Sequence, residues 1–215
     1  MKRIAPIVFR ILVHLGGIIP LIFLFTRFQT NGLGPNPILE LEHQTGKIAL
    51  FFLVLSLACT PARNITGWKE FIRRRKALGL YGASYAFIHV LIFISLDFGF
   101  DFNLIFGEVI NRSFIIVGTI ALAILIVLAI TSNKIAVSIL GSGWKKLHRL
   151  VYILSPLVIL HFAMVTKGNI LKLQGNYTLP LIYAGIVVLL LVMRIPTISR
   201  AIRKEKKNPG SMPAE

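Results

Sequence analysis

Long apolar runs separated by short, mostly basic segments dominate the pattern of this chain. A helix that crosses the hydrocarbon core of a bilayer needs about 20 mostly apolar residues. We predict a spanning helix in each of the six segments that approach this length, the second being the least clear because its apolar run is short. Their approximate bounds are Ile7 to Phe28, Glu42 to Pro61, Ala77 to Leu96, Phe114 to Thr131, Leu147 to Thr166, and Thr178 to Ile195. The pattern therefore predicts an all-α, multi-pass membrane protein built as a six-transmembrane-helix bundle.

The composition agrees with a membrane as the solvent of this chain. Of 215 residues, 55% are hydrophobic and 15% are charged, and the mean hydropathy is +0.77. Lys and Arg number 24 against 8 Asp and Glu, and this net charge of +16 is typical of proteins that contact nucleic acid or an anionic membrane. The basic residues stand in short clusters between apolar runs, and no soluble segment is long enough for a nucleic-acid-binding module. We expect membrane lipid as a partner and no nucleic acid.

The basic clusters also predict the orientation of the bundle. They fall in the N-terminus, in the second and fourth loops and at the C-terminal end, whereas the other loops hold most of the acids. By the positive-inside rule, both termini are predicted to be cytoplasmic. We divide the chain into a transmembrane domain, residues 1–199, and a basic cytoplasmic tail, residues 200–215. The extramembrane stretches of about 15 to 20 residues are too short for a catalytic domain.

The cysteine count and the N-terminus narrow the possibilities further. Cys59 is the only cysteine, so the chain has no internal disulfide, and the C-x-x-C-H motif that attaches a c-type haem is absent. The N-terminus begins with basic residues as a signal peptide does, but Arg10 and His14 interrupt its apolar run and no A-x-A-like cleavage site follows. We expect it to be retained as the first helix.

The histidines are the main candidates for chemistry, because an ionisable side chain in hydrocarbon is costly and neutral imidazole is a ligand of haem iron. At about 1.5 Å per residue, His89 and His161 both lie roughly 21 to 22 Å from the cytoplasmic face, on helices that run in the same direction. We predict that they are the two axial ligands of one b-type haem. His148, near the cytoplasmic surface, is a third candidate ligand. The alternative for any of them is an interhelical hydrogen bond, which is favoured for His14 and His43.

Two further features bear on this site. Gly79, Gly82 and Ala86 share a helix face with His89, which would let a flat macrocycle lie close to the helix, although ordinary helix packing gives the same pattern. His148 and His161 differ by roughly 140° in azimuth on a regular helix, so they share a face only if the helix kinks or unwinds.

Basic residues near the cytoplasmic face are candidate cofactor-binding residues. They are Arg74, Arg75, Lys145 and Lys146. Such side chains bind haem propionates, a flavin phosphate or lipid headgroups, and the alternative is simple anchoring of the helix ends.

Six short motifs, in order along nearly the whole chain, resemble those of one known family. They are V-H-L-G-G-I-I-P, G-L-G-P-N-P, E-H-Q-T-G-K, R-R-R-K-A-L-G-L-Y, L-H-R-L-V-Y and L-I-Y-A-G. On these motifs the sequence resembles the MsrQ (YedZ) family of the ferric-reductase-like transmembrane superfamily.

The resemblance implies a bacterial inner-membrane subunit that holds haem b and FMN. Such a subunit passes electrons from respiratory quinone or a flavin reductase to a periplasmic molybdopterin methionine-sulfoxide reductase, MsrP, in the repair of oxidised periplasmic proteins. The resemblance places iron ligands at His89, His148 and His161. The superfamily often has two histidine pairs, and the second member on the third helix is missing here.

Two other functions share parts of this pattern. A quinol-linked b-type cytochrome with a different partner would have the same physical features. A cofactor-free transporter would need a polar central pathway, whereas the charges here cluster near the helix ends. In the preferred interpretation the chain carries electrons and is not itself the catalytic reductase.

Overall fold

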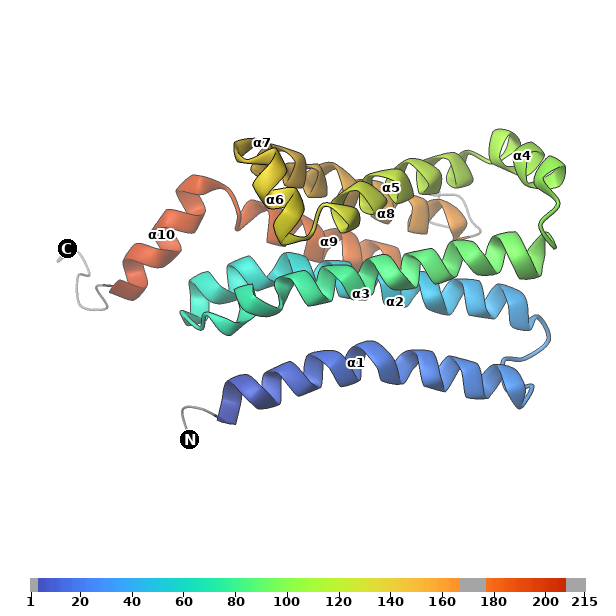
Figure 1. Cartoon of the computed structure of the whole chain (residues 1–215), viewed down its shortest axis with the longest axis horizontal. Coiled ribbons are helices and arrows are strands. Elements are labelled where there is room, and N and C mark those ends of the chain that lie inside the picture. Colours follow the sequence, from blue (N-terminus) through green and yellow to red (C-terminus); the bar gives the residue numbers. More distant parts are fainter. Residues whose placement is uncertain (1–3, 167–176, 208–215) are drawn as a thin grey trace.

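The computed structural model of this protein describes residues 4–166 and 177–207, with side chains described as far as residue 202. It is a bundle of helices, and no strand occurs in these ranges (Figure 1). The elements in chain order are α1 (Ile4–Gln29), α2 (Pro37–Thr66), α3 (Glu70–Ile92), the π-helix η1 (Phe93–Asp97), α4 (Phe102–Asn111), α5 (Ser113–Ile130), α6 (Lys134–Leu140), α7 (Ser142–Leu147), the 3₁₀ turn η2 (His148–Leu150), α8 (Val151–Val165), α9 (Thr178–Val192) and α10 (Pro196–Lys207).

Five of the helical segments are long and apolar enough to cross a membrane, and these are α1, α2, α3 with η1, α5, and the continuous stretch from α7 to α8. A sixth span is formed only if α9 and α10, which meet at a bend of 80°, are taken together as one crossing. The start of α1 and the end of α9 lie at the same end of the bundle, as an even number of crossings requires (Figure 1). The predicted fold class, an all-α multi-pass membrane protein, is confirmed.

The second span, the least clear in the sequence, is the best defined in the structure. At 30 residues α2 is the longest helix, and 44% of its most apolar window is buried, more than in any other spanning helix of the described chain. The side chain of Asn36 accepts a hydrogen bond from the Leu39 backbone N–H at 3.1 Å, and Pro37 begins the helix. Gly67, with φ at 77°, ends it. The capping residues at both ends therefore define this helix although its uninterrupted apolar run is short.

Two short helices in the loops were not predicted. Asp101 caps α4 by accepting from two backbone N–H groups, and Asn133 caps α6 by accepting from Ala136 N at 2.8 Å. These caps are local, so they form short helices without an apolar run of spanning length. At the C-terminal side, α10 crosses the predicted boundary between residues 199 and 200, and the predicted tail beyond residue 207 lies outside the described residues.

The most extensive contact between two helices of the bundle joins α2 and α3. A Cβ atom added at Gly82 would lie 2.9 Å from Leu53 and 3.2 Å from the carbonyl oxygen of Ala49, and one at Gly79 would lie 3.3 Å from Ser56. The small residues of α3 thus allow α2 to approach closely. The expectation that this face holds a flat macrocycle is wrong, because the backbone and side chains of α2 already fill the space.

The first helix approaches α3 most closely at Gly17. A Cβ atom at Gly17 would lie 2.4 Å from ring atoms of Tyr81, and the hydroxyl of Tyr85 donates to the Gly17 carbonyl at 2.8 Å. His14 Nδ1 and the Tyr81 hydroxyl are 2.9 Å apart and share a hydrogen bond. This is the interhelical hydrogen bond expected as the alternative for His14.

This packing predicts opposite outcomes for two adjacent glycines. Gly17→Leu should displace Tyr81 and lower the free energy of unfolding by roughly 1 to 3 kcal/mol, the usual cost of overpacking. Gly16→Leu is the matched control, because a Cβ atom there meets nothing within 4 Å. The apparent Tm of the purified protein in detergent measures both. Equal Tm values for the two variants would show that α1 does not dock through Gly17.

Candidate functional site

His89 lies near the end of α3, immediately before the π-helix η1. Its Nδ1 lies 2.9 Å from the backbone carbonyl oxygen of Glu42 on α2. Because a carbonyl oxygen can only accept, Nδ1 carries the proton and donates it. Nε2 of the neutral imidazole is then left with a lone pair, which is the state in which histidine binds a metal.

His161 on α8 is held in the same way. Its Nδ1 donates to the carbonyl oxygen of Phe114, at the start of α5, over 2.8 Å. A Cβ atom at Gly118 would lie 2.7 Å from His161 Cε1 and 2.8 Å from Nδ1. Gly118 therefore leaves the space that this imidazole occupies on α5, and Nε2 is again the free ring nitrogen.

The structure brings His89 and His161 together from separate spans. Their ring centroids are 6.3 Å apart, with the ring planes at 77° to each other. Two metal–nitrogen bonds of about 2 Å and two half-widths of an imidazole ring add to roughly 6 Å, so one metal ion fits between the rings. Haem iron takes four ligands from its macrocycle and needs only two from the protein. The donor set and its spacing therefore fit the axial positions of a haem.

His148 stands apart from this pair, in the 3₁₀ turn before α8. Its ring stacks on Trp144 with centroids 4.1 Å apart, and its Nε2 lies 3.1 Å from the hydroxyl oxygen of Thr131. That hydroxyl donates to the Val127 carbonyl at 2.7 Å, so it accepts from the Nε2–H of His148. Nδ1 is therefore the nitrogen of His148 that retains a lone pair.

The change in helix type occurs at His148 itself. The segment His148–Leu150 is a 3₁₀ turn, whereas α8 continues as an α-helix through Pro156. The angle expected between His148 and His161 on a regular helix therefore does not apply. Thirteen residues of helix, about 20 Å, still separate them along the bundle.

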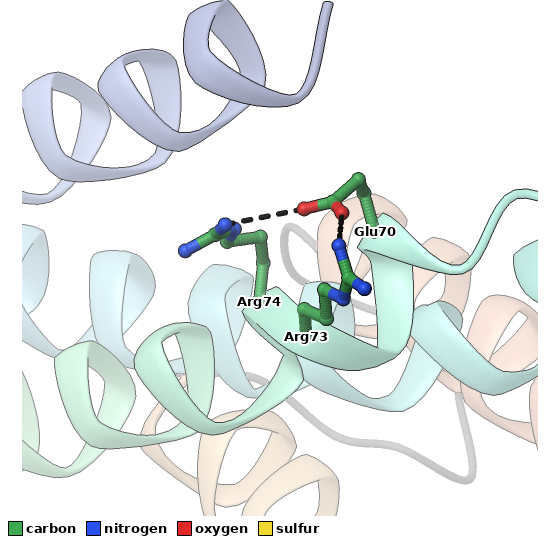
Figure 2. A network of polar contacts seen from close by, with 3 residues as sticks. All are labelled: Glu70, Arg73 and Arg74. Atoms are coloured by element: carbon green, nitrogen blue, oxygen red, sulfur yellow. Dashed lines mark hydrogen bonds and ion pairs between the residues drawn. The ribbon is translucent and has the colours of Figure 1, made fainter. Parts of the chain in front are cut away.

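The predicted cofactor-binding basic residues do not form one group. Glu70 at the start of α3 binds Arg73 and also Arg74, whose Nη2 lies 3.1 Å from its carboxylate (Figure 2). Lys145 and Lys146 are exposed on α7. Arg75 is half-buried, and no carboxylate pairs with it in the described chain.

Arg194, which follows the end of α9, was not among the site residues predicted from the sequence. Its Nη2 donates to the Leu57 carbonyl at 2.6 Å and lies 3.4 Å from the Thr60 hydroxyl. Its Cζ lies over the Tyr152 ring, 5.9 Å from the centroid, and Arg75 is close enough to repel it. A lone arginine between an apolar span and Pro196 was the signal that could have singled it out.

Comparison with known proteins agrees with this arrangement. A family model described as the ferric reductase like transmembrane component matches residues 45–159. The protein-methionine-sulfoxide reductase heme-binding subunit MsrQ of Rhodospirillum rubrum is 39% identical over 193 residues, 89% of this chain and 89% of that protein. The protein of the same name from Brucella anthropi is 36% identical over 198 residues, 92% of this chain and 86% of that protein. This chain belongs to the MsrQ family. No solved structure matches it.

The family model and the MsrQ proteins match different parts of the candidate site. The ferric-reductase-like match contains His89 and His148 and ends just before His161. The similarity to the MsrQ proteins extends over most of the chain. The family is therefore shown by the whole chain, while the pairing of His89 with His161 comes from the geometry.

The contact at Gly118 gives a test of how rigidly this MsrQ-family chain holds His161. Gly118→Ala should force the imidazole away from the Phe114 carbonyl and lower the free energy of unfolding by roughly 1 to 3 kcal/mol. Gly185→Ala on α9 is the control, because a Cβ atom there meets nothing within 4 Å. The measurement is the apparent Tm of each variant in detergent. A Gly118→Ala variant as stable as the control would mean that the ring has room to move.

Proposed function

We propose that this chain is the haem b-binding electron-transfer subunit of a protein-methionine-sulfoxide reductase system in the bacterial inner membrane. The observation that supports this most is the pair formed by His89 and His161, whose free nitrogens suit the two axial positions of one haem. A haem bound there would supply one-electron chemistry between ferric and ferrous iron. The names of the related proteins, which are heme-binding subunits, support the same cofactor.

The protein's own contribution is to hold and orient the two imidazoles. The carbonyl oxygens of Glu42 and Phe114 fix which nitrogen of each ring faces the metal. Both carbonyls belong to neighbouring helices, so packing of α2 on α3 and of α5 on α8 determines the ring positions. This arrangement would hold the two imidazoles in place around a bound haem while it supplied one-electron chemistry.

Electrons are proposed to enter from respiratory quinol or a cytoplasmic flavin reductase. They leave toward a periplasmic molybdopterin methionine-sulfoxide reductase, MsrP, so that oxidised periplasmic proteins are repaired. In this proposal residues 1–199 form the membrane domain and the basic tail is cytoplasmic. His148 acts separately, as an iron ligand at the cytoplasmic end, and FMN is a second cofactor bound near the basic residues there.

The ligand assignment predicts the spectra of histidine variants. His89→Ala and His161→Ala should each lose the low-spin haem signal, because each removes one of two axial nitrogens and the packed bundle offers no replacement at that depth. His148→Ala should leave the signal of the haem held by His89 and His161 intact. Haem content and the electron paramagnetic resonance spectrum of the purified protein measure this.

His14→Ala is the matched control, since it also removes a histidine within a span. The assignment is wrong if His89→Ala and His161→Ala keep full low-spin haem while this control loses it. Purified protein with no haem spectrum would instead favour the cofactor-free transporter.

The proposed orientation predicts the behaviour of reporter fusions. A reporter active only in the periplasm should be silent at Gly210 and active at Asn36, because the basic clusters keep the loops that carry them in the cytoplasm. A cytoplasm-only reporter should give the reverse. Periplasmic activity at Gly210 would invert the proposed path of electrons.

A further inference from the structure

A second polar cluster lies at the end of the bundle away from the histidine pair, among α2, α3, α8 and the end of α9. Arg194 reaches into it from the end of α9 and is fixed there by the Leu57 carbonyl and the Tyr152 ring. Arg75 comes from α3, and its own carbonyl accepts a hydrogen bond from the Ser56 hydroxyl at 3.0 Å. Arg75 is close enough to interact electrostatically with both Arg194 and His148. Two arginines and a histidine thus converge on one place.

The side chains that the structure describes, which end at residue 202, supply no negative charge to this cluster. Glu70 is the one described carboxylate at this end of the bundle, and Arg73 and Arg74 both bind it (Figure 2). The remaining acids whose side chains are described stand at the opposite end, around the start of α2, η1 and α4 (Figure 1). They are Glu40, Glu42, Asp97, Asp101 and Glu108. Two half-buried guanidinium groups that repel each other are costly unless an anion lies between them.

Arg194 also has a donor that nothing in the described chain uses. Its Nε is buried and lacks a hydrogen-bond partner there. A buried donor without a partner destabilises the protein, because it has lost its hydrogen bonds to water without gaining others. The guanidinium group presents its donors as a planar fork that matches the oxygens of a phosphate. An oxyanion between Arg194 and Arg75 would satisfy this donor and neutralise both charges.

We propose that Arg75 and Arg194 bind a phosphate group. The phosphate belongs to an anionic lipid headgroup or to a phosphorylated small molecule such as FMN. Arg194 is tied to a carbonyl of α2 inside the bundle, so it differs from an arginine that merely extends to the membrane surface. The phosphate site is independent of the pair formed by His89 and His161. Only the alternative in which FMN is the ligand rests on the proposed function.

Binding of a soluble phosphorylated ligand is tested with FMN and riboflavin, which differ only in the phosphate. Binding to the full-length protein in neutral detergent is followed by flavin fluorescence. FMN should bind the parent protein more tightly than riboflavin does. Arg75→Gln and Arg194→Gln should each weaken FMN binding by at least about tenfold, because one partner of a partly buried charge pair is lost, and should leave riboflavin unchanged. Arg149→Gln is the control, because it removes an exposed arginine at the same end.

Binding of an anionic lipid headgroup is tested by native mass spectrometry of protein extracted from vesicles of phosphatidylglycerol and phosphatidylcholine. The parent protein and Arg149→Gln should retain phosphatidylglycerol selectively, and Arg75→Gln and Arg194→Gln should not. A loss confined to FMN identifies a soluble ligand, and a loss confined to phosphatidylglycerol identifies a lipid.

The proposal is overturned if the parent protein retains neither probe. It is equally overturned if Arg149→Gln loses as much binding as the two cluster variants do. Should Arg194→Gln fail to fold, Arg194→Lys replaces it: lysine keeps the charge but not the planar fork, so binding should be weaker than in the parent protein. Both experiments measure ligand binding, so their results test the phosphate site whether or not His89 and His161 bind haem.

Discussion

The close contact between α2 and α3 is the interaction on which the rest of the membrane domain depends. Gly82 allows the α2 backbone to approach α3, and this approach places the Glu42 carbonyl against the ring of His89. Phe52 of α2 stacks on Tyr85 with ring centroids 5.8 Å apart, and Tyr85 in turn reaches Gly17 on α1. The opposite face of α2 packs on α8 and α9. A longer side chain at the α2–α3 contact would therefore disturb a ligand, a helix–helix contact and the core together.

The packing of the helices also fixes the hydrogen bonds of the histidines that lie within the membrane. Within hydrocarbon, a histidine must find its hydrogen-bond partner inside the bundle, and the only abundant acceptors there are backbone carbonyl oxygens. His89 and His161 both take such a carbonyl, each from a neighbouring helix. The same bond that satisfies Nδ1 leaves Nε2 free to bind metal. Stability of the bundle and readiness of the ligands therefore come from the same contacts.

The two polar clusters divide the bundle into ends with different chemistry. The histidine pair lies in the half that faces the acidic loops, and the arginine cluster lies at the basic end. Along α3, the 14 residues from Arg75 to His89 span about 21 Å. If the chain carries electrons as proposed, this separation would hold a haem bound by His89 and His161 near a partner on one side of the membrane. The basic end would then face the electron donor on the other side. The short loops keep both partners close to the helix ends.

The sequence by itself determined the all-α, multi-pass fold and the similar depth of His89 and His161, because hydropathy and helix rise depend only on residue order. It also placed His14 as an interhelical hydrogen-bonding residue. Only the tertiary structure decided which small residues face α2, why Gly118 lies opposite His161, and that Arg75 lies near Arg194 while Arg74 is bound by Glu70. Helical periodicity gives the face of a residue but not the neighbour that covers it. That neighbour is fixed by contacts between helices that lie far apart in the chain.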